Sequence, residues 1–226
     1  MTFRIADNIV PPDWRKQIWD YVSAAGWEHG WKSNVKLDQF GFLHKHYAGG
    51  RKSDHNKGIT DADCTEELRG RHPLLHEFWT RLKLEGHTLV RCYANGMPYG
   101  SDGMVHTDSQ DPNAYTIIYY PAERWSPNWG GETIFYNKEE TDLVGAVYPK
   151  PGRLLMFSGV VPHRAGGVSR ICPTLRITLM FKTVMNGGKV QDVPDPARSG
   201  DDPPLGPSVS GTLEGGPRPI TGLGKP

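Results

Sequence analysis

The chain has 226 residues, 37% of them hydrophobic, and its 26 basic residues nearly balance its 25 acidic ones. This length fits one domain with a substantial core, and the near-zero net charge gives no reason to expect nucleic acid or a membrane surface as a partner. The three cysteines are widely spaced without a CxxC pair, and neither a secretion signal nor a membrane-length apolar run is present, so we expect a cytoplasmic protein.

The first 87 residues predict a mainly helical region with a polar interruption. The segment PPDWRKQIWDYVSAAGW begins with proline, places apolar residues on one helical face and ends near Gly26. The segment HPLLHEFWTRLKLEG repeats this pattern and ends at Gly86. Between them, FGFLHKHYAGGRKSDHNKGITDADC is polar and contains glycine, which indicates a long loop or a strand with a loop.

The HKH sequence in this interruption would place His44 and His46 on one face of an extended chain. Three interpretations stay open: a second metal site, a segment that recognises the substrate, or an ordinary polar loop. No carboxylate follows at the spacing of a metal ligand, so the metal interpretation has the least support.

From Thr88 to about Thr183 the sequence changes to short β-type runs. The candidate strands are TLVRCYA, MVHTDS, AYTIIYY, ETIFY, LVGAVY, RLLMF, VVPHRA and LRITLMFK. Turn residues rather than helices separate them, which favours an antiparallel sandwich, jelly roll or barrel. From Gly187 onward the chain is rich in proline and glycine and has no aromatic residue. We therefore predict one domain over residues 1–186, with a support region at 1–87 and a β core at 88–186, followed by a tail at 187–226.

The run GMVHTDSQD, at residues 103–111, contains a histidine and an aspartate two positions apart. On a β-strand His106 and Asp108 would project from the same face. After residue 100 the only other histidine is His163, in FSGVVPHRAGG. Two histidines and one carboxylate form the facial triad of non-haem Fe(II) oxygenases, which leaves coordination positions open. A polar pair on a solvated strand would have the same sequence, so the motif does not decide alone.

Several further blocks accompany this motif in a fixed order. RCYANGMPYG precedes HTD, TIIYY follows it, and WGGETIFY, PKPGRLLMFSGVVPH and LRITLMFK come next. This order resembles the Fe(II)/2-oxoglutarate-dependent oxygenases, and within them the prolyl-4-hydroxylase-like group. The resemblance implies a mainly β fold with flanking α: a double-stranded β-helix, or jelly roll, buttressed by the N-terminal helices. It also implies that His106, Asp108 and His163 are the iron ligands.

The same resemblance implies Fe(II), 2-oxoglutarate as cosubstrate and O2, with ascorbate as a further candidate. Arg176 matches the basic residue that holds the distal carboxylate of oxoglutarate in this group, and Tyr93 and Tyr120 match the tyrosine positions. Thr116 shares a strand face with Tyr120 by its period of two. A guanidinium binds a carboxylate bidentately, and phenolic hydroxyls add directed donors. Arg170 is the competing anchor.

The implied activity is hydroxylation of an unactivated C–H bond, with succinate and CO2 as coproducts. The single-domain layout, without a peptide-binding or repeat module, favours a small molecule such as an amino acid or a biosynthetic intermediate. Two alternatives stay open. One is a peptidyl or prolyl hydroxylase that acts on a protein, and the other is a non-catalytic jelly-roll protein whose HxD and distal histidine are incidental or hold a structural metal.

Overall fold

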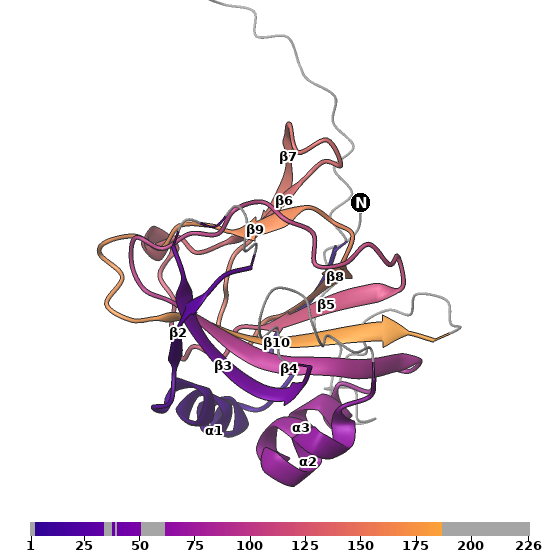
Figure 1. The fold of residues 1–226 in the computed structure, drawn as a ribbon. Coiled ribbons are helices and arrows are strands. Elements are labelled where there is room, and N and C mark those ends of the chain that lie inside the picture. Colours follow the sequence, from indigo (N-terminus) through magenta and orange to yellow (C-terminus); the bar gives the residue numbers. More distant parts are fainter. Residues whose placement is uncertain (1–2, 34–37, 39, 51–61, 187–226) are drawn as a thin grey trace, which may run out of the picture.

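Two antiparallel sheets and three helices make up the fold in the computed structural model (Figure 1), which describes residues 3–33, 38, 40–50 and 62–186. The elements are β1 (Phe3–Ala6), α1 (Pro12–Ser23), β2 (Glu28–Trp31), β3 (Phe42–Gly49), α2 (Thr65–Arg71), α3 (Pro73–Arg81), β4 (His87–Met97), β5 (Ala114–Tyr119), the short 3-10 helix η1 (Pro127–Trp129), β6 (Thr133–Tyr136), β7 (Leu143–Val147), β8 (Leu154–Ser158), β9 (His163–Ala165) and β10 (Arg176–Met185). The predicted tail lies outside the described residues.

The two sheets differ in size. The larger has the strand order β1-β8-β5-β10-β4-β3-β2, and the smaller has the order β7-β6-β9. In Figure 1 the smaller sheet lies above the larger one, and the chain crosses between them after β5, β7, β8 and β9. This is the predicted jelly-roll class, mainly β with flanking helices.

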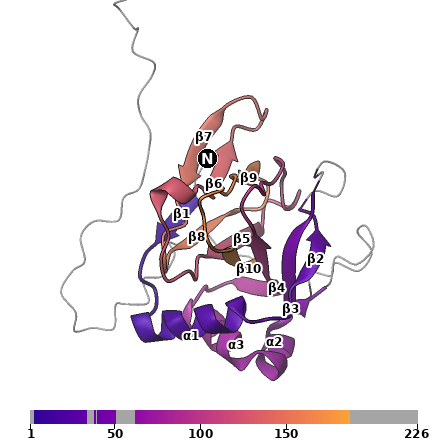
Figure 2. The ribbon, with the colours of Figure 1, turned by 90° about the vertical axis from the view of Figure 1, so that its left-hand side faces the viewer.

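The helices cover the outer face of the larger sheet, as Figure 2 shows from the side. Ile18 of α1 and Phe78 of α3 join Cys92, Leu179 and Phe181 of the sheet in the main hydrophobic core. Both predicted helices are confirmed, and each begins with a proline in its first turn, where the missing N–H costs nothing. The buttressing role expected of the N-terminal helices follows from this packing.

The short α2 was not predicted. Its seven residues, TEELRGR, contain one buried side chain, Leu68, so no apolar periodicity marks it in the sequence. The edge strands β1 and β2 were also missed, because each is four residues long and mostly solvent-accessible. The HKH segment is a strand rather than a loop, since it lies within β3.

All but one of the candidate β runs form strands. The exception is MVHTDS, where only His106 pairs, through an isolated bridge to His163. The expectation that His106 and Asp108 share a strand face was therefore wrong. Their backbone lies in the connection between β4 and β5, where short turns on both sides leave no room for a continuous ladder.

The inner face of the larger sheet carries polar side chains in register. Strand β10 pairs with β4 so that Arg176 faces Met97, Thr178 faces Asn95, Met180 faces Tyr93 and Lys182 faces Arg91. Residues opposite one another in an antiparallel pair lie on the same face, and every second residue of a strand returns to it. The alternate residues of β10, such as Leu179 and Phe181, pack against the helices instead.

The three cysteines of the chain all lie within the described residues. Cys64, Cys92 and Cys172 are all buried and none forms a disulfide. Of the helices that the structure describes, none is long and apolar enough to cross a membrane.

Candidate active site

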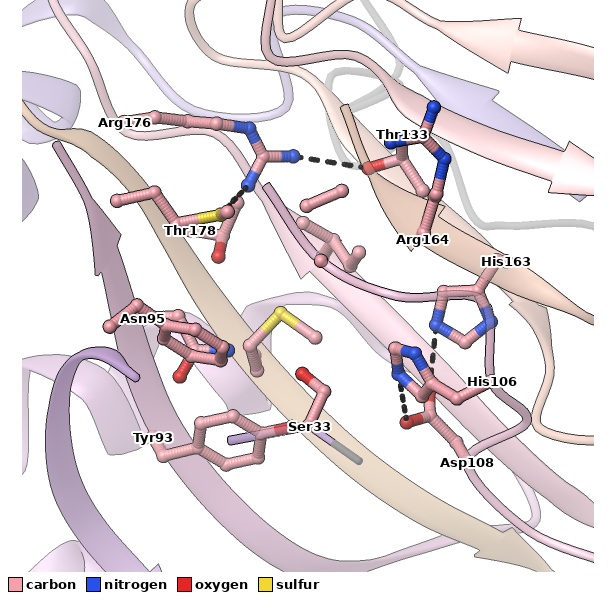
Figure 3. Close-up of a pocket in the computed structure, with 16 residues that line it drawn as sticks. Ser33, Tyr93, Asn95, His106, Asp108, Thr133, His163, Arg164, Arg176 and Thr178 are labelled. Carbon is pink, nitrogen blue, oxygen red and sulfur yellow. Dashed lines mark hydrogen bonds and ion pairs between the residues drawn. The ribbon is translucent and has the colours of Figure 1, made fainter. Parts of the chain in front are cut away.

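Three potential metal-binding side chains converge between the two sheets (Figure 3). His106 and Asp108 come from the β4–β5 connection, and His163 is the first residue of β9. Their ligand atoms lie within 4.8 Å of one another, and no other group of three such residues occurs in the described part of the chain. Asp108 lies between the imidazoles: Oδ2 is 3.3 Å from His163 Nε2, and Oδ1 is 3.7 Å from His106 Nε2.

Backbone hydrogen bonds hold this arrangement in place of a strand ladder. The His106 N–H donates to the His163 carbonyl at 3.0 Å, and the His163 N–H donates back to His106 at 2.9 Å. The Asp108 N–H donates to the Gly159 carbonyl at 2.8 Å. The loop is therefore fastened at both ligand positions to the segment that carries the distal histidine.

Both histidines have a defined tautomer. Nδ1 of His106 lies 2.9 Å from the Met104 carbonyl, and Nδ1 of His163 lies 2.8 Å from the Val161 carbonyl. Because a carbonyl only accepts, each Nδ1 carries a proton, and each Nε2, which faces Asp108, is the ring nitrogen left to bind a metal. Two neutral imidazole nitrogens and a carboxylate fit a borderline divalent ion such as Fe(II), so the residues present suit the metal that the triad implies.

Asp108 also has partners on its other side. Thr116 on β5 donates its hydroxyl to Asp108 Oδ2 at 2.6 Å, and the Lys182 ammonium on β10 contacts the same oxygen and donates to Thr116 Oγ1 at 2.8 Å. Burial alone would raise the pKa of Asp108, but Lys182 and the imidazoles hold it well below its usual range. Asp108 is therefore ionised at neutral pH, as a metal ligand must be.

A second polar centre lies in the same pocket, around Arg176 (Figure 3). This arginine opens β10 and is 3% exposed. Its Nε donates to the Gly131 carbonyl and its Nη2 to Thr133 Oγ1 at 3.3 Å, while the Tyr120 hydroxyl lies 2.7 Å from that same Thr133 oxygen. Gly131 has φ of 80°, and a Cβ there would lie 2.8 Å from Arg176 Cδ, so only glycine fits.

Arg176 has no acidic partner. Among the described residues no carboxylate lies within salt-bridge distance of its guanidinium, and its partners are a carbonyl, a hydroxyl and the sulfur of Met97. Glu132 acts on this guanidinium only from beyond salt-bridge distance, and a buried charge without a direct anionic partner is costly. The pocket therefore suits a ligand with a carboxylate that can pair with Arg176.

Comparison with known proteins agrees with this site. The profile of the 2OG-Fe(II) oxygenase superfamily matches residues 89–181, which span the triad and Arg176. The chain belongs to the 2OG-Fe(II) oxygenase superfamily. Fe(II) and 2-oxoglutarate are accordingly its cofactor and cosubstrate.

Solved structures share the fold of this oxygenase at low sequence identity. A prolyl-4-hydroxylase from Pseudomonas putida is 18% identical, with a TM-score of 0.52 over 81% of this chain and 92% of its own. An oxidoreductase of the 2OG-Fe(II) oxygenase family from Burkholderia pseudomallei is 14% identical, with a TM-score of 0.52 over 80% and 84%. A prolyl hydroxylase from Trichoplax adhaerens, in complex with a hypoxia inducible factor peptide fragment, is 16% identical, with a TM-score of 0.53 over 81% and 83%. No curated protein matches the chain.

The remaining candidate residues of the oxygenase fall into two groups. Tyr93 lines the pocket, and Tyr120 lies behind Thr133, so both are near Arg176 or the route to it. Thr116 is instead engaged with Asp108 and Lys182, at the other end of the inner face. Arg170 is exposed in the turn before β10 and does not line the pocket.

Some residues of the site were not predicted. Thr133, Asn95 and Thr178 line the pocket, and Lys182 contacts Asp108. A signal for Lys182 was present, since it lies an even number of residues after Arg176 on one strand and must share its face. The contact with Asp108 has no such signal, because it depends on how the β4–β5 connection folds over the sheet.

His44 of the HKH segment packs behind the wall of the site, against Asn95 and Tyr93. His44 stacks on Trp31, with ring centroids 3.8 Å apart and planes at 6°, and its Nδ1 lies 3.0 Å from Asn95 Oδ1. Lys45 points to the opposite face, where it donates to the carbonyls of Val22 and Ala24. His44 is thus packed against the pocket, and in the described structure it belongs to no second metal cluster.

Proposed function

We propose that this oxygenase hydroxylates an unactivated C–H bond of a small molecule, with succinate and CO2 as coproducts. The observation that carries the proposal is a histidine–aspartate–histidine triad in one pocket with a buried arginine that lacks an acidic partner. Such a pair of centres suits a metal at one end and the far carboxylate of a dicarboxylic cosubstrate at the other.

In this proposal the residues have separate roles. Nε2 of His106, Nε2 of His163 and the carboxylate of Asp108 hold Fe(II), while Arg176 binds the distal carboxylate of oxoglutarate with Tyr93 and the Thr133–Tyr120 pair beside it. Fe(II), oxoglutarate and O2 together supply the oxidant that a C–H bond requires. The protein orients the cosubstrate through the Arg176 guanidinium and keeps Asp108 ionised through Thr116 and Lys182.

A peptide substrate is the second candidate. Phe40, Tyr99 and Met104 are 81%, 63% and 45% exposed, and Met104 follows Gly103, which lines the pocket. Apolar side chains exposed beside a pocket are typical of surfaces that bind another chain. The Trichoplax protein of similar fold was solved with a peptide fragment bound.

The test has an anaerobic binding step and an aerobic turnover step. Anaerobic addition of Fe(II) and then oxoglutarate should give a weak visible charge-transfer band, which His163→Ala should abolish. Under air, a metabolite library and a peptide library should be compared for succinate release and for a product that has gained one oxygen atom. Turnover with peptides alone would select the second candidate, and a chain without oxoglutarate-dependent O2 uptake would be a non-catalytic jelly-roll protein.

A further inference from the structure

A second basic side chain on the inner face of the larger sheet lacks an acidic partner. Arg91 lies on β4, and its Nε and Nη1 are buried without any hydrogen-bond acceptor. Within the described residues no carboxylate lies at salt-bridge distance from it. Leaving the donors of a charged group buried and unused costs free energy, so their position calls for an explanation.

The register places Arg91 beside the metal centre. Arg91 is directly opposite Lys182, whose ammonium contacts Asp108, so both side chains lie on the inner face. The Arg91 guanidinium carbon is 5.0 Å from the centroid of the Tyr93 ring, and Tyr93 lines the pocket. Arg91 does not itself line the pocket, so the cation stands directly behind Tyr93 and beside the lysine that contacts Asp108.

Arg91 and Arg176 are at opposite ends of this inner face. Arg176 pairs with Met97 and Lys182 with Arg91, and strands rise by about 3.3 Å per residue, so the two arginines are roughly 20 Å apart along the sheet. A five-carbon dicarboxylate anchored at Arg176 is much shorter than this separation. The Arg91 end is left for the other reactant.

The charges of the site point the same way. Fe(II) and Arg176 together balance Asp108 and the two carboxylates of oxoglutarate. Lys182 and Arg91 do not line the pocket, but they stand as additional positive charges on the same face of the sheet, and no described acidic side chain pairs with Arg91. A substrate with one negative group would reduce this surplus, whereas a neutral substrate would not.

We infer that Arg91 binds a carboxylate of the substrate, and that the substrate is therefore a small carboxylic acid, with free amino acids the simplest class. This inference rests on the proposed function and specifies its substrate class. Nε and Nη1 of the guanidinium are buried without an acceptor, and Tyr93 contacts the cation through its ring face. Internal segments of a peptide backbone carry no such group.

The test compares acids with matched neutral compounds. The protein is loaded with Mn(II) and saturating oxoglutarate, so that Arg176 is already occupied, and is titrated with free L-amino acids and their α-carboxamides while its unfolding temperature is followed. At least one free acid should bind, with its carboxamide weaker by about 30-fold or more. The Fe(II) protein in air should release succinate with that acid and not with its amide.

Variants then assign the preference to Arg91. Arg91→Met should lose the difference between acid and amide and leave the oxoglutarate requirement unchanged, and Arg91→Lys should keep the preference at lower affinity. Arg81→Met is the matched control, because Arg81 also lies over an aromatic ring, Trp14, but on the exposed surface of α3. The ligand-free Arg91→Met protein should unfold at the same or a higher temperature, since a buried charge without a partner has been removed.

Several outcomes would overturn the inference. In the binding experiments they are equal affinity for acid and amide, no binding of any free acid, and an acid preference that survives Arg91→Met. In the turnover experiments the contrary outcome is reaction with peptides or neutral compounds alone. An Arg91→Met protein too unstable to fold would show that Arg91 is a structural residue. Absence of all Fe(II)- and oxoglutarate-dependent turnover, with every substrate tried, would instead contradict the proposed function.

Discussion

Arg176 and Arg170 are close in sequence but have opposite surroundings. Arg176 is buried in the pocket against Gly131 and Thr133, whereas Arg170 is exposed in the preceding turn. An exposed cation contributes little to the binding of an anion, while a buried one leaves its partner desolvated and unpaired when it is removed. The two substitutions should therefore have very different effects.

We expect Arg176→Met to weaken oxoglutarate binding by roughly thirtyfold to several-thousandfold, which corresponds to about 2–5 kcal/mol. Iron binding should hardly change, because the guanidinium is not a ligand. Arg170→Met should alter oxoglutarate affinity only a few-fold. Anaerobic titration of both variants with oxoglutarate measures this, and the reverse order of effects would assign the anchor to Arg170.

The support of Asp108 can be tested with an isosteric change. Thr116→Val removes the hydroxyl that donates to Asp108 Oδ2 and accepts from Lys182. Loss of a partner behind a metal ligand typically costs 10–100-fold in metal affinity, and we expect a loss of about that size. Thr178→Val is the control, because Thr178 lines the pocket without a described hydrogen bond to the triad. Equal Fe(II) affinities in the two variants would argue against this role of Thr116.

Among the elements, β3 and β10 show how alternation divides one strand between two environments. Strand β10 turns Arg176 and Lys182 to the inner face and Phe181 to the helices, and β3 likewise turns His44 toward Asn95 and Tyr93 and Lys45 away from them. His44 is 3% exposed between Trp31 and Tyr93. Burial disfavours the charged form of an imidazole, so the stability of the fold around β3 should depend on pH.

Burial lowers the pKa of His44 from 6.5 to about 4. Below pH 6.5 His44 is protonated in the unfolded chain but stays neutral in the folded protein. The free energy of unfolding should therefore fall as the pH is lowered from 6.5 to 4, and level off below pH 4. The total loss in the free energy of unfolding caused by this histidine at low pH is about 3 kcal/mol. His44→Phe keeps the stacking and removes the proton site, so its stability should fall less over this range. Denaturant unfolding at several pH values measures both slopes, and parallel curves would contradict the prediction.

At the scale of the whole molecule, one jelly roll with three helices on its outer face accounts for the described chain (Figure 1). The main core joins the helices to the larger sheet, and a second core of side chains such as Phe135, Phe157 and Met180 lies between the sheets. A third cluster lies around Trp125, and the described part of the chain that forms these cores ends at residue 186, the predicted domain boundary.

We therefore expect truncation after residue 186 to leave the fold and the iron site intact. The removed segment, rich in proline and glycine, has too little apolar content to complete a core. Thermal unfolding and Fe(II) affinity of the truncated chain should match those of the full chain. Loss of a cooperative transition would show that the boundary is misplaced, and a change in substrate affinity alone would place the tail near the pocket.

The sequence by itself determined the features that depend on local pattern. Alternating apolar runs predicted β4 to β10, prolines and apolar periodicity predicted α1 and α3, and the order of motifs around His106, Asp108 and His163 predicted the superfamily. Local pattern was sufficient to predict these elements because the residues on one face of a strand or helix recur with a fixed period along the chain.

Only the tertiary structure decided which side chains meet. The strand expected at His106 is a loop fastened to β9, and Thr116 belongs with Asp108 and Lys182 rather than with Arg176. Contacts of this kind join residues that are far apart in sequence, and they depend on strand register and on the path of a loop between two sheets. A period of two records which face a residue occupies, but it carries no information about which residue of another strand lies beside it.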